Sequence, residues 1–226
     1  MVDFFDTKFF NKFEIKKSIF SDFVGFEISK FYTKAIFTYV TFMSFVNFRE
    51  TKFYDGLDLS TINIKENINF LNAEISLKNT NRETFRLVKY SFDKIGNYIE
   101  ANKFFVKEMK KYKEELSNKR WISNFQEKFV FWINETFSTF GSDYILSILW
   151  IILFSEIYTM FKFCLDYSNI NRKGLMYLFN QMALNFYPFN KKILIAHWEI
   201  ISVIYYIIIS ILIWMTIVSI KRNTKR

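Results

Sequence analysis

Large apolar residues recur at a fixed spacing from Val2 to Leu77, with mostly polar residues between them. The steps alternate between five and six residues, so the underlying period is eleven. A small or β-branched residue usually stands two positions before each large one, and residues two apart on an extended strand face the same way. The large positions are Phe4, Phe9, Ile15, Phe20, Phe26, Phe31, Phe37, Phe42, Phe48, Phe53, Leu59, Ile64, Phe70 and Ile75. This pattern predicts a β-structure that repeats every eleven residues, each unit covering the apolar column of the one before.

Two other structures share part of this pattern. A helical coiled coil can also repeat every eleven residues, but its apolar stripe needs steps of three and four. An ordinary strand-rich domain with coincidental spacing of phenylalanines is the second alternative. The paired columns at i and i−2 favour the repeating β-structure over both.

The paired columns are seen in Ala35-Ile36-Phe37, Val46-Asn47-Phe48 and Leu57-Asp58-Leu59. They resemble the pentapeptide-repeat family in its Phe-rich, eleven-residue variety. The resemblance implies a right-handed four-sided β-helix over residues 1–78, with two units in each coil. Three and a half such coils would rise roughly 17 Å. The sequence departs from the commonest family pattern because it lacks a regular Ala and has a bulky Phe13.

Helix signals replace the repeat from residue 79 and predict a helical linker over 79–120. Thr80 and Glu83 have the spacing of a capping box, and Gly96 suits the left-handed position after a helix. We expect this first helix to cap the open end of the β-helix. A second helix is predicted over 98–116, either packed on a neighbour or serving as a coiled-coil connector. Its apolar stripe comprises Ala101, Phe105, Met109, Tyr112 and Leu116.

The remainder of the chain has the pattern of a membrane region. Residues 121–143 combine aromatic and basic side chains, which predicts an amphipathic interfacial helix, although a plain packed helix is an alternative. Apolar runs over 144–163 and 200–220 are long enough to span a bilayer, and they define a membrane region over 144–226. Glu156 interrupts the first run. A short helical pattern over 175–186 ends before Pro188.

The linker carries a second resemblance. Asn81-Arg82-Glu83-Thr84, Asn97-Tyr98-Ile99-Glu100-Ala101-Asn102 and Glu108-Met109 are similar to the connection between pentapeptide repeats and paired membrane helices in some bacterial membrane proteins. That similarity implies a bacterial inner (plasma) membrane location. It implies no activity.

Charge is distributed unevenly and bears on partners and orientation. The formal net charge is +9, and all of the positive excess lies after residue 77, beside and within the apolar runs. This favours an anionic lipid bilayer as partner, and no nucleic acid is expected. The first residues show no signal peptide, and basic residues follow the second run, so both termini are predicted to be cytoplasmic. The loop over 166–199 would then face outward despite its own basic residues.

Catalytic chemistry finds little support in the sequence. The single cysteine, Cys164, excludes an internal disulfide, and the single histidine, His197, excludes a His-pair metal site. With no Gly-rich phosphate loop either, we expect no enzyme, no cofactor and no metal.

Two functions remain. The first is a membrane-anchored scaffold whose β-helix binds an unidentified protein partner. The second is an oligomeric two-span channel-like or membrane-perturbing protein, without the Thr-Val-Gly-Tyr-Gly filter of potassium channels. The candidate membrane pathway comprises Glu156, Asn180, Gln181 and Asn185. A homo-oligomer is expected, formed through the uncovered first coil or the stripe of the second helix.

Overall fold

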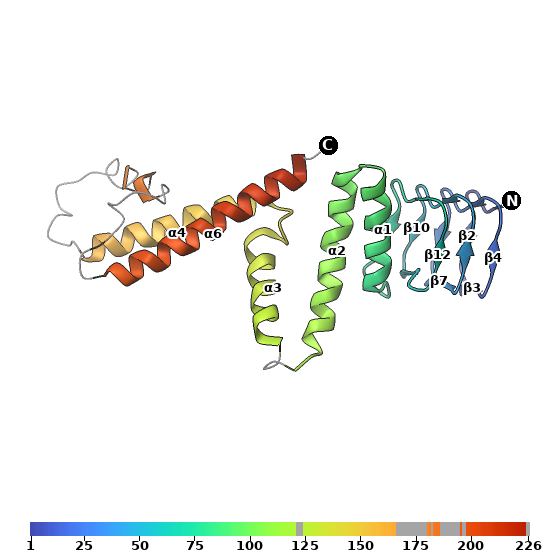
Figure 1. The fold of residues 1–226 in the computed structure, drawn as a ribbon, viewed down its shortest axis with the longest axis horizontal. Helices are drawn as coiled ribbons and strands as arrows, with labels where there is room; N and C mark the ends of the chain where they lie inside the picture. Colours follow the sequence, from blue (N-terminus) through green and yellow to red (C-terminus); the bar gives the residue numbers. More distant parts are fainter. Residues whose placement is uncertain (121–123, 166–179, 182, 186–194, 196–197, 225–226) are drawn as a thin grey trace. The chain divides into compact units, whose positions relative to one another are not determined.

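A computed structural model describes residues 1–120, 124–165, 180–181, 183–185, 195 and 198–224. Met1–Lys128 and Phe129–Asn223 form the bodies of two compact units. The first unit holds the strands and the first two helices, and the second holds the long apolar helices (Figure 1).

Fourteen short strands wind into a β-solenoid of about three turns, and parallel strands stack into four sheets that form its sides. The first side contains β1 (Val2–Asp3), β5 (Val24–Gly25), β9 (Val46–Asn47) and β13 (Ile68–Asn69). The second side contains β2 (Lys8–Phe9), β6 (Lys30–Phe31), β10 (Lys52–Phe53) and β14 (Glu74–Ile75). The third side contains β3 (Phe13–Lys16), β7 (Ala35–Thr38) and β11 (Leu57–Asp58). The fourth side contains β4 (Ile19–Phe20), β8 (Thr41–Phe42) and β12 (Asn63–Ile64).

The register of these strands confirms the predicted period. Val24 pairs with Val46, and Phe31 pairs with Phe53, so equivalent residues of successive coils are twenty-two positions apart. Two eleven-residue units therefore make one coil. The prediction of a β-solenoid followed by helices, two of them apolar enough to span a membrane, is confirmed.

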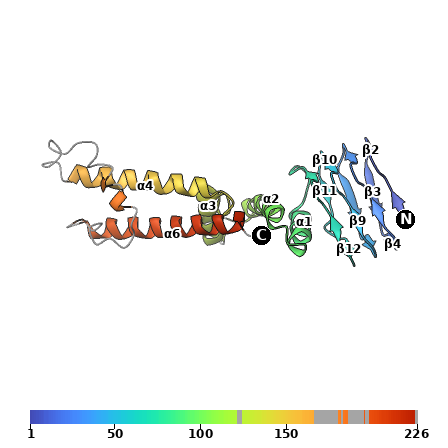
Figure 2. The ribbon, with the colours of Figure 1, turned by 90° about the horizontal axis from the view of Figure 1, so that it is seen from above.

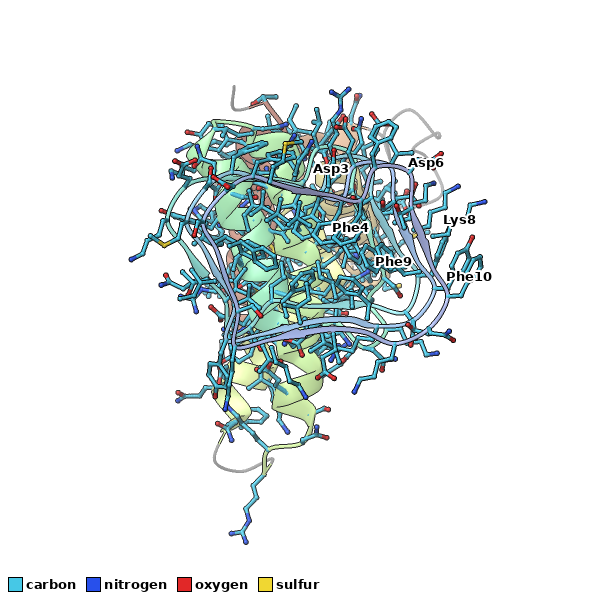
Figure 3. The ribbon with its side chains drawn as sticks, turned by 90° about the vertical axis from the view of Figure 1, so that its right-hand side faces the viewer. Asp3, Phe4, Asp6, Lys8, Phe9 and Phe10 are labelled. Carbon is cyan, nitrogen blue, oxygen red and sulfur yellow. The ribbon has the colours of Figure 1, made fainter. Side chains whose placement is uncertain are left out.

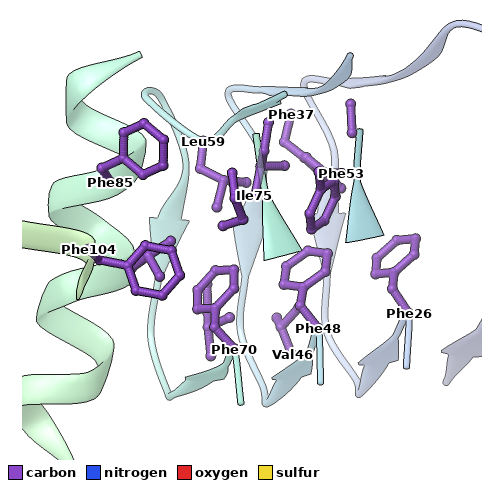
Figure 4. Close-up of a cluster of buried hydrophobic side chains, with 14 of the residues drawn as sticks. Phe26, Phe37, Val46, Phe48, Phe53, Leu59, Phe70, Ile75, Phe85 and Phe104 are labelled. Carbon is purple, nitrogen blue, oxygen red and sulfur yellow. The ribbon is translucent and has the colours of Figure 1, made fainter. Parts of the chain in front are cut away.

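The ladder residues fill the interior of the solenoid in stacked columns (Figure 4). Phe26, Phe48 and Phe70 stack with ring centroids 5.1 and 5.3 Å apart, and all three side chains are buried. Buried hydroxyls two positions before the large ladder residues form hydrogen bonds between coils. The Thr51 hydroxyl, for example, donates to the Phe26 carbonyl at 2.6 Å. Stacked rings and shared hydrogen bonds thus lock each coil to its neighbour.

The first coil is less buried than the coils that follow it. Phe4, Phe9 and Phe20 are half-buried, whereas their equivalents one coil further on, Phe26, Phe31 and Phe42, are fully buried. The cause is position, since the first coil has a neighbour on only one side.

Two helices cover the other end of the solenoid. Phe85, Val88 and Phe92 of α1 (Arg82–Lys94) and Phe104 of α2 (Tyr98–Ser117) join the same hydrophobic core as the ladder. Figure 4 shows Phe85 and Phe104 beside the last coils. The expectation that α1 covers this end is confirmed. Gly96 between the helices has φ +76°, as its predicted role after α1 requires.

Two details of this helical pair correct the sequence analysis. The N-cap of α1 is Asn81, whose side chain accepts from the Thr84 amide, so Thr80 and Glu83 do not form the capping box. In α2 the buried side chains include Phe104 and Glu108, whereas Phe105 and Met109 of the predicted stripe are half-buried. Ala101 and Leu116 of the stripe are buried as predicted, so the packed face differs from the predicted one only between them.

Three helices account for most of the remaining described chain: α3 (Phe125–Ser138), α4 (Tyr144–Leu165) and α6 (Glu199–Thr224). Both α4 and α6 are long and apolar enough to cross a membrane, which suits the spans predicted over 144–163 and 200–220. They lie side by side in Figures 1 and 2. Residues 180–181 and 183–185 are helical, and Pro188, His197 and most of the loop over 166–199 lie outside the described residues.

Candidate functional site

A buried polar cluster joins α4 to α6 and to the short helical segment around Asn185. The Tyr158 hydroxyl donates to the Ser202 hydroxyl at 2.9 Å, and the Tyr205 hydroxyl donates to the Asn185 carbonyl at 3.1 Å. The Asn185 amide nitrogen donates to the Thr159 hydroxyl at 2.7 Å. All five side chains are buried. We call these residues, together with Lys162, the hairpin cluster.

The aromatic rings of the hairpin cluster are packed face to face. The ring centroids of Tyr158 and Tyr205 are 3.9 Å apart with an angle of 4° between the ring planes. Ile209 completes a small apolar core with them. Since their hydroxyls point to different helical segments, the tyrosine pair fixes both the distance between the two apolar helices and their rotation.

A cation lies at the edge of the hairpin cluster. The Lys162 ammonium donates to the Asn185 side-chain oxygen at 3.2 Å and lies 5.1 Å from the centre of the Tyr158 ring. Asn185 therefore accepts from Lys162 through its oxygen and donates to Thr159 through its nitrogen. An amide that bridges a cation and a hydroxyl satisfies groups that would be costly to expose to hydrocarbon.

The structure brings only part of the predicted membrane pathway together. Asn185 lies in the hairpin cluster, and Gln181 is half-buried on the same short helical segment. Asn180 and Glu156 are exposed. Ser155 and Thr159, which flank Glu156 on α4, are buried, and the Thr159 hydroxyl donates to the Ser155 carbonyl at 2.7 Å.

Sequence reasoning missed most of the hairpin cluster. On α4, Ser155, Tyr158, Thr159 and Lys162 follow one another at steps of three, one and three, which places them on one helical face. On α6, Ser202 and Tyr205 begin the buried face. A search for polar residues at helical spacing within the apolar runs would have found this signal.

The opposite end of the hairpin is closed by hydrogen bonds to the turn before α4. Arg222 on α6 donates to the Phe140 carbonyl, and the Asn223 amide nitrogen donates to the Ser142 carbonyl at 2.8 Å. The start of α4 and the end of α6 therefore meet, so the two helices run in opposite directions. The turn contains three successive left-handed residues, Thr139, Phe140 and Gly141, and these contacts hold it in place.

On the solenoid, the second side carries two regular columns of outward side chains. Lys8, Lys30 and Lys52 are in register from coil to coil. Beside them, Phe10, Tyr32 and Tyr54 form an exposed stack with ring centroids 4.8 and 5.1 Å apart. These three aromatic side chains are 64%, 41% and 48% exposed. We call the six residues the Lys–aromatic face.

The lysines of this face are only partly neutralised. Lys52 is paired with Glu74 at 2.6 Å, and this contact raises the pKa of the Lys52 ammonium. Within the described chain, Lys8 and Lys30 make no ion pair. Like charges in register repel one another, and the lysines without an acidic partner give this side of the solenoid a positive electrostatic potential.

Side chains of the helical linker form hydrogen bonds with backbone groups of the last coil that have no further strand to pair with. The amides of Leu57 and Leu59 donate to the hydroxyls of Thr80 and Thr84 at 3.0 and 2.8 Å. The Lys107 ammonium donates to the Ile75 carbonyl at 2.9 Å. Burial against the aromatic core lowers the pKa of Lys107. These contacts leave the helical end closed to another strand, unlike the first coil.

No family model, characterised protein or solved structure matches this chain. Membership of the pentapeptide-repeat family therefore stays a prediction from the residues, while the repeat β-helix itself is established by the parallel strands. Among the described residues, no three His, Cys, Asp or Glu side chains are grouped so that they could hold a metal ion.

Proposed function

We propose that this protein is a membrane-anchored repeat scaffold: α4 and α6 hold it in a bilayer, and the solenoid binds a protein partner. The Lys–aromatic face carries the binding part of this proposal. Its columns are regular, its aromatic side chains are exposed, and its position is fixed by the buried ladder beneath it. Rigid surfaces with preset side chains lose little entropy on binding.

The chemistry of the Lys–aromatic face favours an acidic protein segment. Lys8 and Lys30 offer unpaired ammonium groups, and the aromatic stack offers ring edges and tyrosine hydroxyls beside them. Binding of single-stranded nucleic acid uses open ring faces on which bases stack. In this column the faces of Tyr32 are covered by Phe10 and Tyr54, so that mode is disfavoured. A binding role, rather than a catalytic one, suits this surface.

The anchor part of the proposal is supported by how the hairpin satisfies its own polar groups. Tyr158, Asn185 and Tyr205 bond across helices, while most exposed positions of α4 and α6 are apolar. Interhelical bonds of this kind are a common device in membrane helix pairs. The antiparallel hairpin places both of its outer ends on one side, and Lys221 and Arg222 favour the cytoplasm for that side. We propose a bacterial inner-membrane location with both termini cytoplasmic.

Photo-crosslinking in cells tests the scaffold. A photoreactive amino acid replaces Tyr32 on the Lys–aromatic face or, as the matched control, Asn63, which is exposed on the fourth side. We expect a discrete protein adduct from position 32 and none from position 63. The adduct should disappear when Lys30 and Lys52 are changed to Glu. Equal labelling at both positions, or an adduct that survives the charge reversal, would reject this binding face.

One observation favours the alternative, an oligomeric channel-like protein. Glu156 is exposed on α4, in the middle of a segment proposed to lie in hydrocarbon. A carboxylate facing lipid is costly, whereas one facing another copy or a water-filled space is not. If the pathway lies between copies, Glu156→Gln should change cation preference in a conductance measurement without changing membrane insertion. Conductance that is unaltered by this substitution would remove Glu156 from any pathway.

A further inference from the structure

The first coil of the solenoid presents an open end. Phe4 stacks on Phe26 with ring centroids 5.2 Å apart, and Phe9 stacks on Phe31 at 4.5 Å. One face of each first-coil ring is therefore covered by the second coil. Figure 3 looks onto this end, with Phe4 and Phe9 inside the outline of the coil and Asp3 and Lys8 near its rim. Both rings are half-buried, in contrast to the fully buried rings beneath them.

The backbone of the first coil has hydrogen-bonding groups that point away from the second coil. The amides of Val2 and Phe4 donate to carbonyls of the second coil, at 3.0 and 2.9 Å. Successive residues of a strand direct their backbone groups to opposite sides, so the N–H and C=O of Asp3 point outward. On β2, the carbonyls of Thr7 and Phe9 accept from the second coil at 2.9 and 3.0 Å. The backbone groups of Lys8 therefore also point outward.

The side chains at this edge carry complementary charges. Asp3 and Lys8 are both exposed, and neither forms an ion pair with a described residue. Residues 1–22 contain four lysines and four carboxylates, so two such ends do not repel each other. The other acidic side chain on an outward strand position, Glu14, is already held by Lys12 at 2.6 Å and Lys16 at 2.7 Å. These contacts lower the pKa of Glu14.

We propose that two copies of this chain dock head to head through their first coils, around a two-fold axis at the corner between β1 and β2. A two-fold rotation about this axis places β1 of one copy antiparallel to β2 of the second copy. Asp3 then lies opposite Lys8 of the second copy, and the outward N–H and C=O of the two residues exchange hydrogen bonds. By symmetry the pair forms twice.

The proposed contact satisfies the outward groups of Asp3 and Lys8 and covers the rings beside them. In each of the two Asp3–Lys8 pairs, four backbone groups find hydrogen-bond partners and one carboxylate meets one ammonium group. The uncovered ring faces of Phe4 and Phe9 are also removed from water. The other diagonal axis would set Lys8 opposite Glu14, whose carboxylate already has two partners. The free pair therefore selects the axis between β1 and β2.

This proposal does not depend on the scaffold function, because it uses the outward edge of the first coil, and Lys8 is the one residue that this edge shares with the Lys–aromatic face. The test measures the molar mass of the full chain in detergent at micromolar concentration by light scattering. We expect a dimer for the wild type. Asp3→Lys and Lys8→Asp should each weaken the dimer roughly tenfold or more. The double variant Asp3→Lys/Lys8→Asp should restore it. Lys30→Asp, in the same column one coil further on, is the matched control and should leave the dimer unchanged.

A second measurement covers the case in which a charge reversal disturbs the first coil. In a Cys164→Ser background, one chain carries Asp3→Cys and another carries Lys8→Cys, and the mixture is oxidised. We expect a disulfide between the two kinds of chain, and little between chains that both carry Asp3→Cys. The proposal is overturned by a monomeric wild type, by a dimer that both charge reversals leave intact, or by a failure of the mixed chains to crosslink.

Discussion

The Lys107 ammonium on α2 donates a hydrogen bond of 2.9 Å to the Ile75 carbonyl on the last strand of the solenoid. This contact shows how the linker closes a β-solenoid: a long side chain reaches past the aromatic core to a backbone acceptor that has no further coil above it. Phe104 contributes the packing beside it, with its ring centre 5.0 Å from the same ammonium.

Replacing Lys107 by methionine should loosen the last coil. The substitution keeps the apolar stem but leaves the Ile75 carbonyl without its donor, a loss of about 1–2 kcal/mol. Hydrogen exchange of the full chain should show faster exchange in peptides covering residues 68–77. Lys110→Met, at an exposed position of the same helix, serves as control. Unchanged exchange in the Lys107 variant would show that the contact does not close the solenoid.

The contrast between the first and second coils predicts different costs for the same substitution in one column. Phe20 and Phe42 are paired in register on the fourth side, but Phe42 is fully buried and Phe20 is half-buried. Phe42→Ala should destabilise the solenoid by about 3–5 kcal/mol through the cavity it leaves. Phe20→Ala should cost clearly less. Thermal unfolding followed by protease resistance of the solenoid compares the two variants, and equal losses would contradict the stacking order.

The buried carboxyl of Glu108 should make the stability of the folded chain depend on pH. Its side chain is buried on α2, and this burial raises the pKa of its carboxyl despite the nearby cations Lys89, Arg82 and Arg86. A raised folded-state pKa means that the folded chain binds the proton more tightly. The contribution of Glu108 to stability is therefore fully present below the ordinary carboxyl pKa and is lost as the pH rises through the folded-state pKa.

Glu108→Gln should accordingly raise the melting temperature at pH 7, and the gain should vanish near pH 4. Glu114→Gln, on an exposed position of the same helix, should show neither effect. A Glu108→Gln variant that is less stable than the wild type at pH 7 would mean that the ionised carboxylate has a stabilising partner.

The hairpin cluster can be tested by a double-mutant cycle on Tyr158 and Ser202. Their hydroxyls are 2.9 Å apart, and Tyr158→Phe keeps the ring stacked on Tyr205. With Ser202→Ala as the second change, the coupling energy should be about 0.6 kcal/mol, within the range measured for hydrogen bonds between membrane helices. Unfolding of the full chain in a bilayer mimetic measures it. A coupling of zero would show that ring stacking and apolar packing, rather than this hydrogen bond, join α4 and α6.

The solenoid could be predicted from the sequence because its signal is local and repeated. Each ladder residue, such as Phe48, meets neighbours twenty-two positions away that obey the same rule, so the period alone defines the contact. The assignment of the α1 cap failed for the opposite reason. The Thr80 hydroxyl is used by the Leu57 amide of the last coil, a partner that no local pattern reveals.

The candidate site was harder to predict than the fold. Glu156 stood out because a charge in an apolar run is conspicuous, yet it is exposed. Tyr158 and Ser202 did not stand out, because tyrosine and serine barely interrupt an apolar window. Their importance lies in the contact between them, across forty-four residues, and only the packing of α4 on α6 creates it.

The scaffold account is tested most directly by ion flux from liposomes that contain the purified full-length protein. Resistance to alkaline extraction first establishes that α4 and α6 are inserted. An inserted hairpin whose buried polar cluster is hydrogen-bonded within one copy should then give flux no greater than that of liposomes prepared without protein, for cations and anions alike. Flux that rises with the amount of protein and falls with Glu156→Gln would contradict the anchor and establish a conducting assembly instead.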